Sequence, residues 1–201
     1  GETIWQAAAR LGTDIPHLCY KDDAGYRPDG NCRACMVEIE GERVLAASCI
    51  RTPAEGMVVS SQSYRAKTAR KMVMELLVSD QPDREVAHDP SSELWKYATE
   101  QDVDTGRFPP KFSPEPDSSH PAIAVNMDAC IQCNLCVRAC REVQVNDVIG
   151  LAGRGADAHI VFDFGDDMGA STCVGCGECV QACPTGALMP KTLLDDEQKL
   201  A

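Results

Sequence analysis

The sequence predicts an α+β protein in which two small cysteine-rich modules are joined by a cysteine-free segment. Three observations support this. The 201 residues include 12 cysteines, all of which lie within residues 19–49 and 130–183. Residues 36–46 alternate apolar and other side chains around a glycine, as a β-hairpin does, whereas residues 65–78 follow helical spacing. The segment 80–121 contains seven prolines and no cysteine, which is typical of a linker.

The first module is predicted to begin with a helix over residues 3–11, which Gly12 ends. Ile4, Ala8 and Leu11 form its apolar face. Residues 36–40 and 43–46 are predicted to pair as a hairpin through Gly41, with residues 57–59 as a third strand. The helix over residues 65–78 is predicted to bury a stripe formed by Ala69, Met72, Val73, Leu76 and Leu77.

The proline-rich segment is expected to lie along the surface of its neighbours. It contains one short helix, in which Leu94, Trp95 and Ala98 follow a start at Asp89 and Pro90. The predicted boundaries are residues 1–78 for the first module, 79–121 for the linker, 122–190 for the second module and 191–201 for a tail.

The second module repeats itself. Its first four cysteines recur 43 positions later, as Cys130, Cys133, Cys136 and Cys140 followed by Cys173, Cys176, Cys179 and Cys183. Residues 148–151 and 160–162 are predicted to be strands joined by a glycine-containing turn. This predicts two copies of one short unit related by a pseudo-twofold axis.

Composition excludes several classes of function. With 31 acidic and 19 basic side chains the formal net charge is −12, which argues against nucleic acid as a partner. No apolar run approaches the ~20 residues that a membrane span needs. Closely spaced cysteines favour a metal centre over a disulfide framework, and free thiols indicate a reducing compartment. The residues from Gly1 onward lack the apolar stretch of a signal peptide, so a cytoplasmic location is expected.

The cysteine spacing indicates iron–sulfur chemistry. Two copies of C-x2-C-x2-C-x3-C favour [4Fe–4S] clusters, since zinc sites prefer pairs of C-x2-C. Cys19, Cys32, Cys35 and Cys49 form C-x12-C-x2-C-x13-C, which contains one C-x2-C and leaves a zinc site as the alternative.

These patterns resemble two kinds of ferredoxin. The first set is similar to the [2Fe–2S] β-grasp module of plant-type ferredoxins, with a longer first spacing and without the amino-terminal hairpin. The second half resembles the bacterial two-cluster ferredoxin, in which the fourth cysteine of each run serves the other cluster. A helix that starts at the third cysteine carries the fourth away from its own triplet. The resemblance therefore implies one [4Fe–4S] cluster on Cys130, Cys133, Cys136 and Cys183, and another on Cys173, Cys176, Cys179 and Cys140.

The order of modules and the sequence between the cysteines resemble one particular family. This is the large subunit of soluble NAD-dependent molybdenum or tungsten formate dehydrogenases. The similar segments read HLC at residues 17–19, PDGNCRACMVE at 28–38, DACIQC at 128–133, CREVQVNDVIG at 140–150 and CVQACPTGALMP at 179–190. The resemblance implies an oxidoreductase that converts formate to CO2 at a Mo or W bis-pterin guanine dinucleotide centre. Electrons would then reach FMN and NAD on a diaphorase-type partner subunit.

On this resemblance the chain is a piece of a larger subunit, carries electrons and holds no catalytic residue. The pterin-binding domain would follow residue 190. Two alternatives stay open: a stand-alone electron carrier, or a cluster subunit of an NAD-reducing hydrogenase or NADH:quinone oxidoreductase. Those relatives usually add a cluster with one histidine and three cysteines after the long helix, whereas residues 79–120 here contain no cysteine.

The remaining candidates are weaker. His17 precedes Cys19 by two residues but more often such a histidine only packs, and three further histidines, His88, His120 and His159, lack a partner constellation. Residues 150–155 lack the glycine order of a nucleotide-binding loop. Arg138 and Arg141 flank Cys140 and either raise a local potential or are simply solvated.

Overall fold

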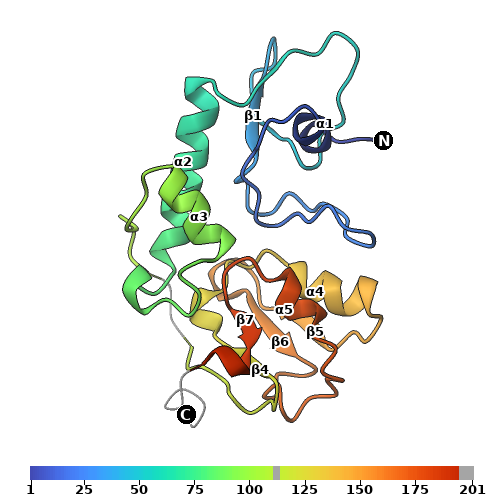
Figure 1. Cartoon of the computed structure of the whole chain (residues 1–201), viewed down its shortest axis with the longest axis vertical. Helices are drawn as coiled ribbons and strands as arrows, with labels where there is room; N and C mark the ends of the chain where they lie inside the picture. Colours follow the sequence, from blue (N-terminus) through green and yellow to red (C-terminus); the bar gives the residue numbers. More distant parts are fainter. Residues whose placement is uncertain (111–113, 195–201) are drawn as a thin grey trace.

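The computed structural model describes residues 1–110 and 114–194. Figure 1 shows an amino-terminal part around a small sheet, a carboxy-terminal part that contains β4 to β7, and the helices α2 and α3 beside them. The linker residues 111–113 and the tail residues 195–201 lie outside the described part. No helix within the described residues is long and apolar enough to cross a bilayer.

The predicted amino-terminal helix is confirmed as α1, Ile4–Arg10. Thr3 caps it: its hydroxyl accepts from the Gln6 N–H, while the Gln6 side chain accepts from the Thr3 N–H, as in a capping box. The placement of Leu11 on the buried face is wrong, because this side chain is 76% exposed. The helix ends at Arg10, so Leu11 is already its cap residue and leaves the apolar face.

The amino-terminal sheet has three antiparallel strands in the order β2-β1-β3. The central strand β1, Met36–Ile39, pairs with β2, Ala46–Ala47, and with β3, Val59–Ser60. The predicted hairpin is therefore confirmed, although its second strand begins at Ala46 because the turn extends through residues 40–43.

The long helix is α2, Tyr64–Ser79, and its predicted buried stripe is wrong in part, since Leu77 packs against the apolar core but two other members do not. Met72 and Leu76 are exposed. The buried face is displaced around the helix axis from the predicted one and comprises Ala66, Arg70, Met74 and Val78. The apolar pattern does not indicate this face, because it contains a charged residue. Arg70 is nevertheless buried, and it donates to the Met36 carbonyl at 2.9 Å.

The proline-rich segment contains a short 3-10 turn, Arg84–Val86, and the helix α3, Glu93–Glu100. The helix begins after Ser92, because Asp89 instead caps a turn through the Ser91 N–H. The prediction that this segment lies on the surface is wrong for α3. Four of its side chains are buried in the largest apolar core: Leu94, Trp95, Tyr97 and Ala98.

The carboxy-terminal part contains two antiparallel pairs of strands. The pair β5, Ile149–Ala152, with β6, His159–Phe162, confirms the predicted strands and their turn. The pair β4, Ile123–Val125, with β7, Leu188–Pro190, had no sequence signal. Two short helices each begin one residue before the third cysteine of a run: α4, Leu135–Arg138, and α5, Glu178–Ala182. The remaining turns are a π-helical turn, Ala139–Val143, and 3-10 turns at Met127–Ala129, Gly155–Asp157 and Lys191–Leu193.

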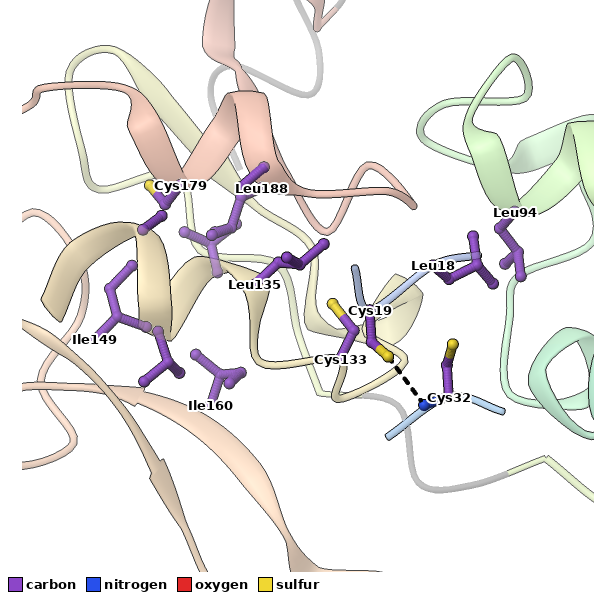
Figure 2. Packing of buried hydrophobic residues seen from close by; sticks show 14 of the residues in the cluster. Leu18, Cys19, Cys32, Leu94, Cys133, Leu135, Ile149, Ile160, Cys179 and Leu188 are labelled. Atoms are coloured by element: carbon purple, nitrogen blue, oxygen red, sulfur yellow. Dashed lines mark hydrogen bonds between the residues drawn. The ribbon is translucent and has the colours of Figure 1, made fainter. Parts of the chain in front are cut away.

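One apolar core joins both parts of the chain. It contains Leu18 from the amino-terminal part, Leu94 from α3, and Leu135 and Ile160 from the carboxy-terminal part (Figure 2). A second core lies under the amino-terminal sheet and includes Val37. The cysteines therefore lie on elements whose relative positions are fixed by shared packing.

Candidate metal centres

The four amino-terminal cysteines lie together in the interior, each at most 9% exposed. Strand pairing explains half of this arrangement. Cys35 directly precedes β1 and Cys49 follows β2, and the register Met36↔Ala47 places these two ends side by side. The Ser48 N–H donates to the Cys35 carbonyl at 3.2 Å, and the buried Ser48 hydroxyl donates to the same oxygen at 2.9 Å.

The four thiols are hydrogen-bonded to one another, and this shifts their acidity in opposite directions. Hydrogen bonds from the Cys32 and Cys49 thiols lower the pKa of Cys19 to about 2. The Cys49 thiol likewise lowers the pKa of Cys35 to about 7, against the effect of burial. The two donor thiols have raised pKa values. The four side chains are thus close enough to act on one another's acidity, as ligands of one centre would be, and the thiolate is the form that binds metal.

Backbone N–H groups also point at these sulfurs. The Cys32 N–H donates to the Cys19 Sγ at 3.4 Å (Figure 2). The Ala34 N–H donates to the Cys32 Sγ at 3.5 Å. The loop reaches this geometry through left-handed residues at Gly30 and Arg33, with φ of 66° and 60°. Hydrogen bonds to sulfur are one of the means by which a protein sets the potential of an iron–sulfur cluster.

The first carboxy-terminal triplet lies near the fourth cysteine of the other run. Burial raises the pKa of Cys133 and of Cys136, and the charge of Cys183 adds to both shifts. Pairing of β4 with β7 explains this approach, because Cys130 follows β4 and Cys183 precedes β7. The Leu188 N–H donates to the Cys183 Sγ at 3.5 Å.

The second triplet lies near Cys140 in the same manner. One pocket is lined by Cys140 together with Cys173, Cys176 and Cys179. Burial raises the pKa of Cys179 to about 12, with contributions from the charges of the other three. Cys140 lies on the π-helical turn, and the Val148 N–H, just before β5, donates to its sulfur at 3.3 Å. The structure therefore brings each triplet together with the fourth cysteine of the opposite run.

The other sequence candidates have structural partners. His17 packs edge-on against Trp5, with ring centroids 4.4 Å apart, and its Nδ1 lies 3.3 Å from the Tyr97 hydroxyl. The His88 Nε2 pairs with Asp128 at 2.9 Å.

His120 is buried, and its Nδ1 accepts the Ala122 and Ile123 N–H groups, whereas His159 is exposed beside Asp157. The glycines of residues 150–155 belong to β5 and the turn that follows it.

The two flanking arginines differ. Arg141 is solvated and pairs with Asp147 at 2.6 Å, whereas Arg138 is 2% exposed. Sequence reasoning missed Arg70, which lies close enough to Cys35 for that charge to act on it. A signal existed: Arg70 stands four residues from both Ala66 and Met74, on the face that α2 buries.

Comparison with known proteins agrees with the two groups of cysteines. Residues 1–64 match the "2Fe-2S iron-sulfur cluster binding domain" family, and residues 129–187 match the "4Fe-4S dicluster domain" family. The chain carries two iron–sulfur cluster-binding domains. The prediction of iron–sulfur chemistry for both halves is confirmed at this level.

Related sequences contain both domains in one stretch. The chain is 36% identical over 200 residues to the "NADP-reducing hydrogenase subunit HndD" of Solidesulfovibrio fructosivorans, covering 94% of this chain and 33% of that protein. It is 34% identical over 196 residues to the "NADH-ubiquinone oxidoreductase 78 kDa subunit, mitochondrial" of Candida albicans, covering 95% and 26%. The chain thus spans a third or less of these curated relatives and is related to a part of each.

A solved structure has the same fold. A chain in the "Crystal structure of NAD+-reducing [NiFe]-hydrogenase in the H2-reduced state" superposes with a TM-score of 0.85 at 24% identity, covering 99% of this chain and 92% of that chain. This likeness therefore concerns the fold of nearly the whole chain, including both domains.

Proposed function

We propose that the chain is an electron-transfer module that holds three iron–sulfur clusters. The observation that carries this is the gathering of the cysteines into groups, with four buried together in the amino-terminal part and Cys140 lining one pocket with the second triplet. The proposed sets are a [2Fe–2S] cluster on Cys19, Cys32, Cys35 and Cys49, a [4Fe–4S] cluster on Cys130, Cys133, Cys136 and Cys183, and a [4Fe–4S] cluster on Cys173, Cys176, Cys179 and Cys140. In this proposal residues 1–78 and 122–190 form the two domains, and residues 79–121 join them.

The surroundings of these cysteines fit anionic clusters. Backbone N–H groups donate to sulfur in each proposed set. Two buried guanidinium groups, Arg70 and Arg138, each keep a buried Nε that has no hydrogen-bond partner among the residues that the structure describes. The zinc alternative needs four ligands around one ion, and zinc sites favour pairs of C-x2-C over triplets with a separate fourth cysteine.

The three sets follow one another through the molecule. Cys19 lies close enough to Cys133 for its charge to act on that thiol, and both belong to the shared core (Figure 2). Cys136 is affected in the same way by Cys179. Each cluster, when bound, exchanges one electron at a time. The first [4Fe–4S] position is thus the middle of a relay, and this chain's role is to fix the spacing of the three positions and exclude water between them.

Within this function we propose that the chain belongs to the large subunit of an NAD-dependent molybdenum or tungsten formate dehydrogenase. The sequence around the cysteines and the absence of cysteine from residues 79–120 support this assignment. The two electrons released when formate becomes CO2 and a proton would pass through this module towards FMN and NAD on a diaphorase-type partner. A pterin domain of the same subunit would follow the tail that begins at residue 191. Relatedness to the hydrogenase and quinone oxidoreductase subunits favours those enzymes as the second candidate.

The test uses the native complex that contains this chain, prepared without oxygen. Formate, hydrogen and NADH are added to separate samples, and reduction of the [2Fe–2S] cluster is followed by EPR. Reduction by formate supports the formate dehydrogenase. Reduction by hydrogen identifies a hydrogenase. Reduction by NADH, with no reduction by formate or hydrogen, identifies the quinone oxidoreductase type. A chain isolated alone near 22 kDa, with clusters that none of the three reduces, is a stand-alone carrier. A chain without iron contradicts the whole proposal.

A further inference from the structure

Arg138 is the largest fully buried side chain of the described residues. It is the last residue of α4 and stands between Cys136 and Cys140, which belong to different proposed clusters. Its guanidinium reaches across to the amino-terminal domain, where Nη2 donates to the Cys19 carbonyl at 2.7 Å and Nη1 pairs with Asp29. The guanidinium therefore contacts a ligand residue of one proposed cluster, and Arg138 lies two residues along the chain from a ligand of each of the other two.

The burial of this charge calls for an explanation. A buried ion pair gains little stability over apolar packing, because the desolvation penalty offsets the attraction. Within the described residues, Asp29 is the only carboxylate that pairs with Arg138; its side chain is 19% exposed and also lies 3.5 Å from Arg27. The Arg138 Nε has no hydrogen-bond partner there. Arg27 pairs in turn with Glu142 at 3.1 Å, so the charges around Arg138 balance, and the Arg138 Nε–H is the donor that this part of the protein leaves unused.

An anionic cluster beside Cys19 would lie next to this buried guanidinium. Reduction adds one electron to such a cluster, and a cation in a medium of low dielectric constant stabilises the added charge. The guanidinium acts at short range, because it donates to the carbonyl of a ligand residue itself. Asp29 acts in the opposite sense, so the two side chains are expected to shift the potential in opposite directions.

We propose that Arg138 is a positioning residue that fixes the Cys19 loop to the dicluster domain and raises the reduction potential of the [2Fe–2S] cluster. This inference rests on the proposed function, since it requires the cluster. Arg141 provides a matched control. It lies three residues further on, bears the same charge and pairs with Asp147, but its side chain is 54% exposed and its ion pair stays within the carboxy-terminal domain.

The experiment measures the midpoint potential of the [2Fe–2S] cluster by redox titration with EPR detection, in the whole 201-residue chain loaded with iron and sulfide. Arg138→Gln is expected to disfavour reduction at least tenfold, which is about 59 mV for one electron. Asp29→Asn is expected to favour reduction, by a smaller factor because Asp29 is partly solvated. Arg141→Gln is expected to leave the equilibrium within about twofold of wild type, because its charge is screened by solvent.

Opposite shifts for the Arg138 and Asp29 variants support the inference, because a purely structural role would not reverse sign with charge. Cluster-bearing Arg138→Gln protein with an unchanged potential overturns it while leaving the proposed function intact. If Arg138→Gln loses its iron, Asp29→Asn decides: a rise in potential supports the inference, and no change overturns it. Wild-type chain that binds no iron overturns the proposed function and, with it, this inference.

Discussion

The two cysteine runs of the carboxy-terminal domain build the same loop from different residues. Gln132 and Asn134 in the first run have φ of 55° and 62°, and Gly175 and Gly177, 43 positions later, have φ of 69° and 79°. The left-handed conformation is strained for residues other than glycine. The first run tolerates it because tertiary contacts hold the loop, including a hydrogen bond from the Gln132 side chain to the Ala158 carbonyl. The second run lies at the surface, so glycine has to supply the conformation by itself.

The comparison also concerns burial. Cys133 of the first run is buried, whereas Cys176, its counterpart in the second, is exposed. The first run faces the amino-terminal domain and α3, and the second run forms an outer surface with Val174 exposed. Repeating a cysteine pattern therefore yields one protected and one accessible site, and the surrounding elements decide which is which.

The largest expected effect comes from exchanging the fourth cysteines. Cys140→Ser replaces a thiolate by a harder ligand, and it should remove the cluster of the second run, about four of about ten irons. Cys183→Ser should instead remove the cluster of the first run. Because the first run adjoins Cys19, only Cys183→Ser should sharpen the [2Fe–2S] EPR signal by removing a magnetic neighbour. Loss of that broadening in Cys140→Ser would mean that each run binds its own cluster.

A smaller effect is expected when the metal is removed. After chelation under reducing conditions, iodoacetamide should modify Cys176 at least about tenfold faster than Cys133. The reason is that Cys176 is exposed, whereas burial excludes the reagent from Cys133 and raises the pKa of its thiol. Timed mass spectrometry of peptides measures both rates, and urea-unfolded chain provides the control in which the difference should vanish. Equal rates in the folded chain would show that the protection depends on the clusters.

Glycine substitutions test how each loop is held. Gly177→Ala should lower the free energy of unfolding by about 1–2 kcal/mol, because alanine is strained at φ 79° although its Cβ would meet no atom within 4 Å. Gln132→Gly should change it by less than about 1 kcal/mol, since relief of strain offsets the lost hydrogen bond. Urea titration followed by circular dichroism measures both. A larger loss for Gln132→Gly would show that the side-chain contact, not the backbone, dominates.

An effect of similar size concerns the contact between the amino-terminal domain and the second run. The Tyr26 hydroxyl donates to Glu178 at 2.8 Å. Tyr26→Phe keeps the ring and removes this bond, so it should cost about 1 kcal/mol. The same titration measures this change, with Tyr64→Phe, at an exposed tyrosine, as the control. An equal effect at both positions would show that the contact contributes nothing specific.

Local patterns predicted much of this molecule, and the failures have physical causes. The cysteine repeat indicated two related units because ligand spacing is a local property. The stripe of α2 was misassigned because Arg70 is buried through a hydrogen bond to a distant carbonyl. Pairing of β4 with β7 escaped prediction because two three-residue strands so far apart in the chain carry no local signal. The burial of α3 was missed for the same reason, since it depends on both domains at once.

Among the candidate sites, residue identity could be predicted but surroundings could not. Spacing selected all twelve cysteines, yet both arginines beside Cys140 looked equivalent in the sequence. Only the fold places the Arg138 guanidinium against the Cys19 carbonyl and leaves Arg141 in solvent. Which triplet is protected likewise depends on contacts between segments that lie far apart in the chain.

The β4–β7 pair also determines how the carboxy-terminal domain is attached to the rest of the chain. The register Ile123↔Pro190 places the two ends of the domain on adjacent strands. A domain whose ends adjoin can be inserted into another chain, or permuted, with little disturbance of its interior. A circularly permuted form that joins residue 190 to residue 123 through a short linker and opens the β5–β6 turn should keep its fold. The chain therefore enters and leaves this domain at one place, while the shared core holds the domain against the amino-terminal part.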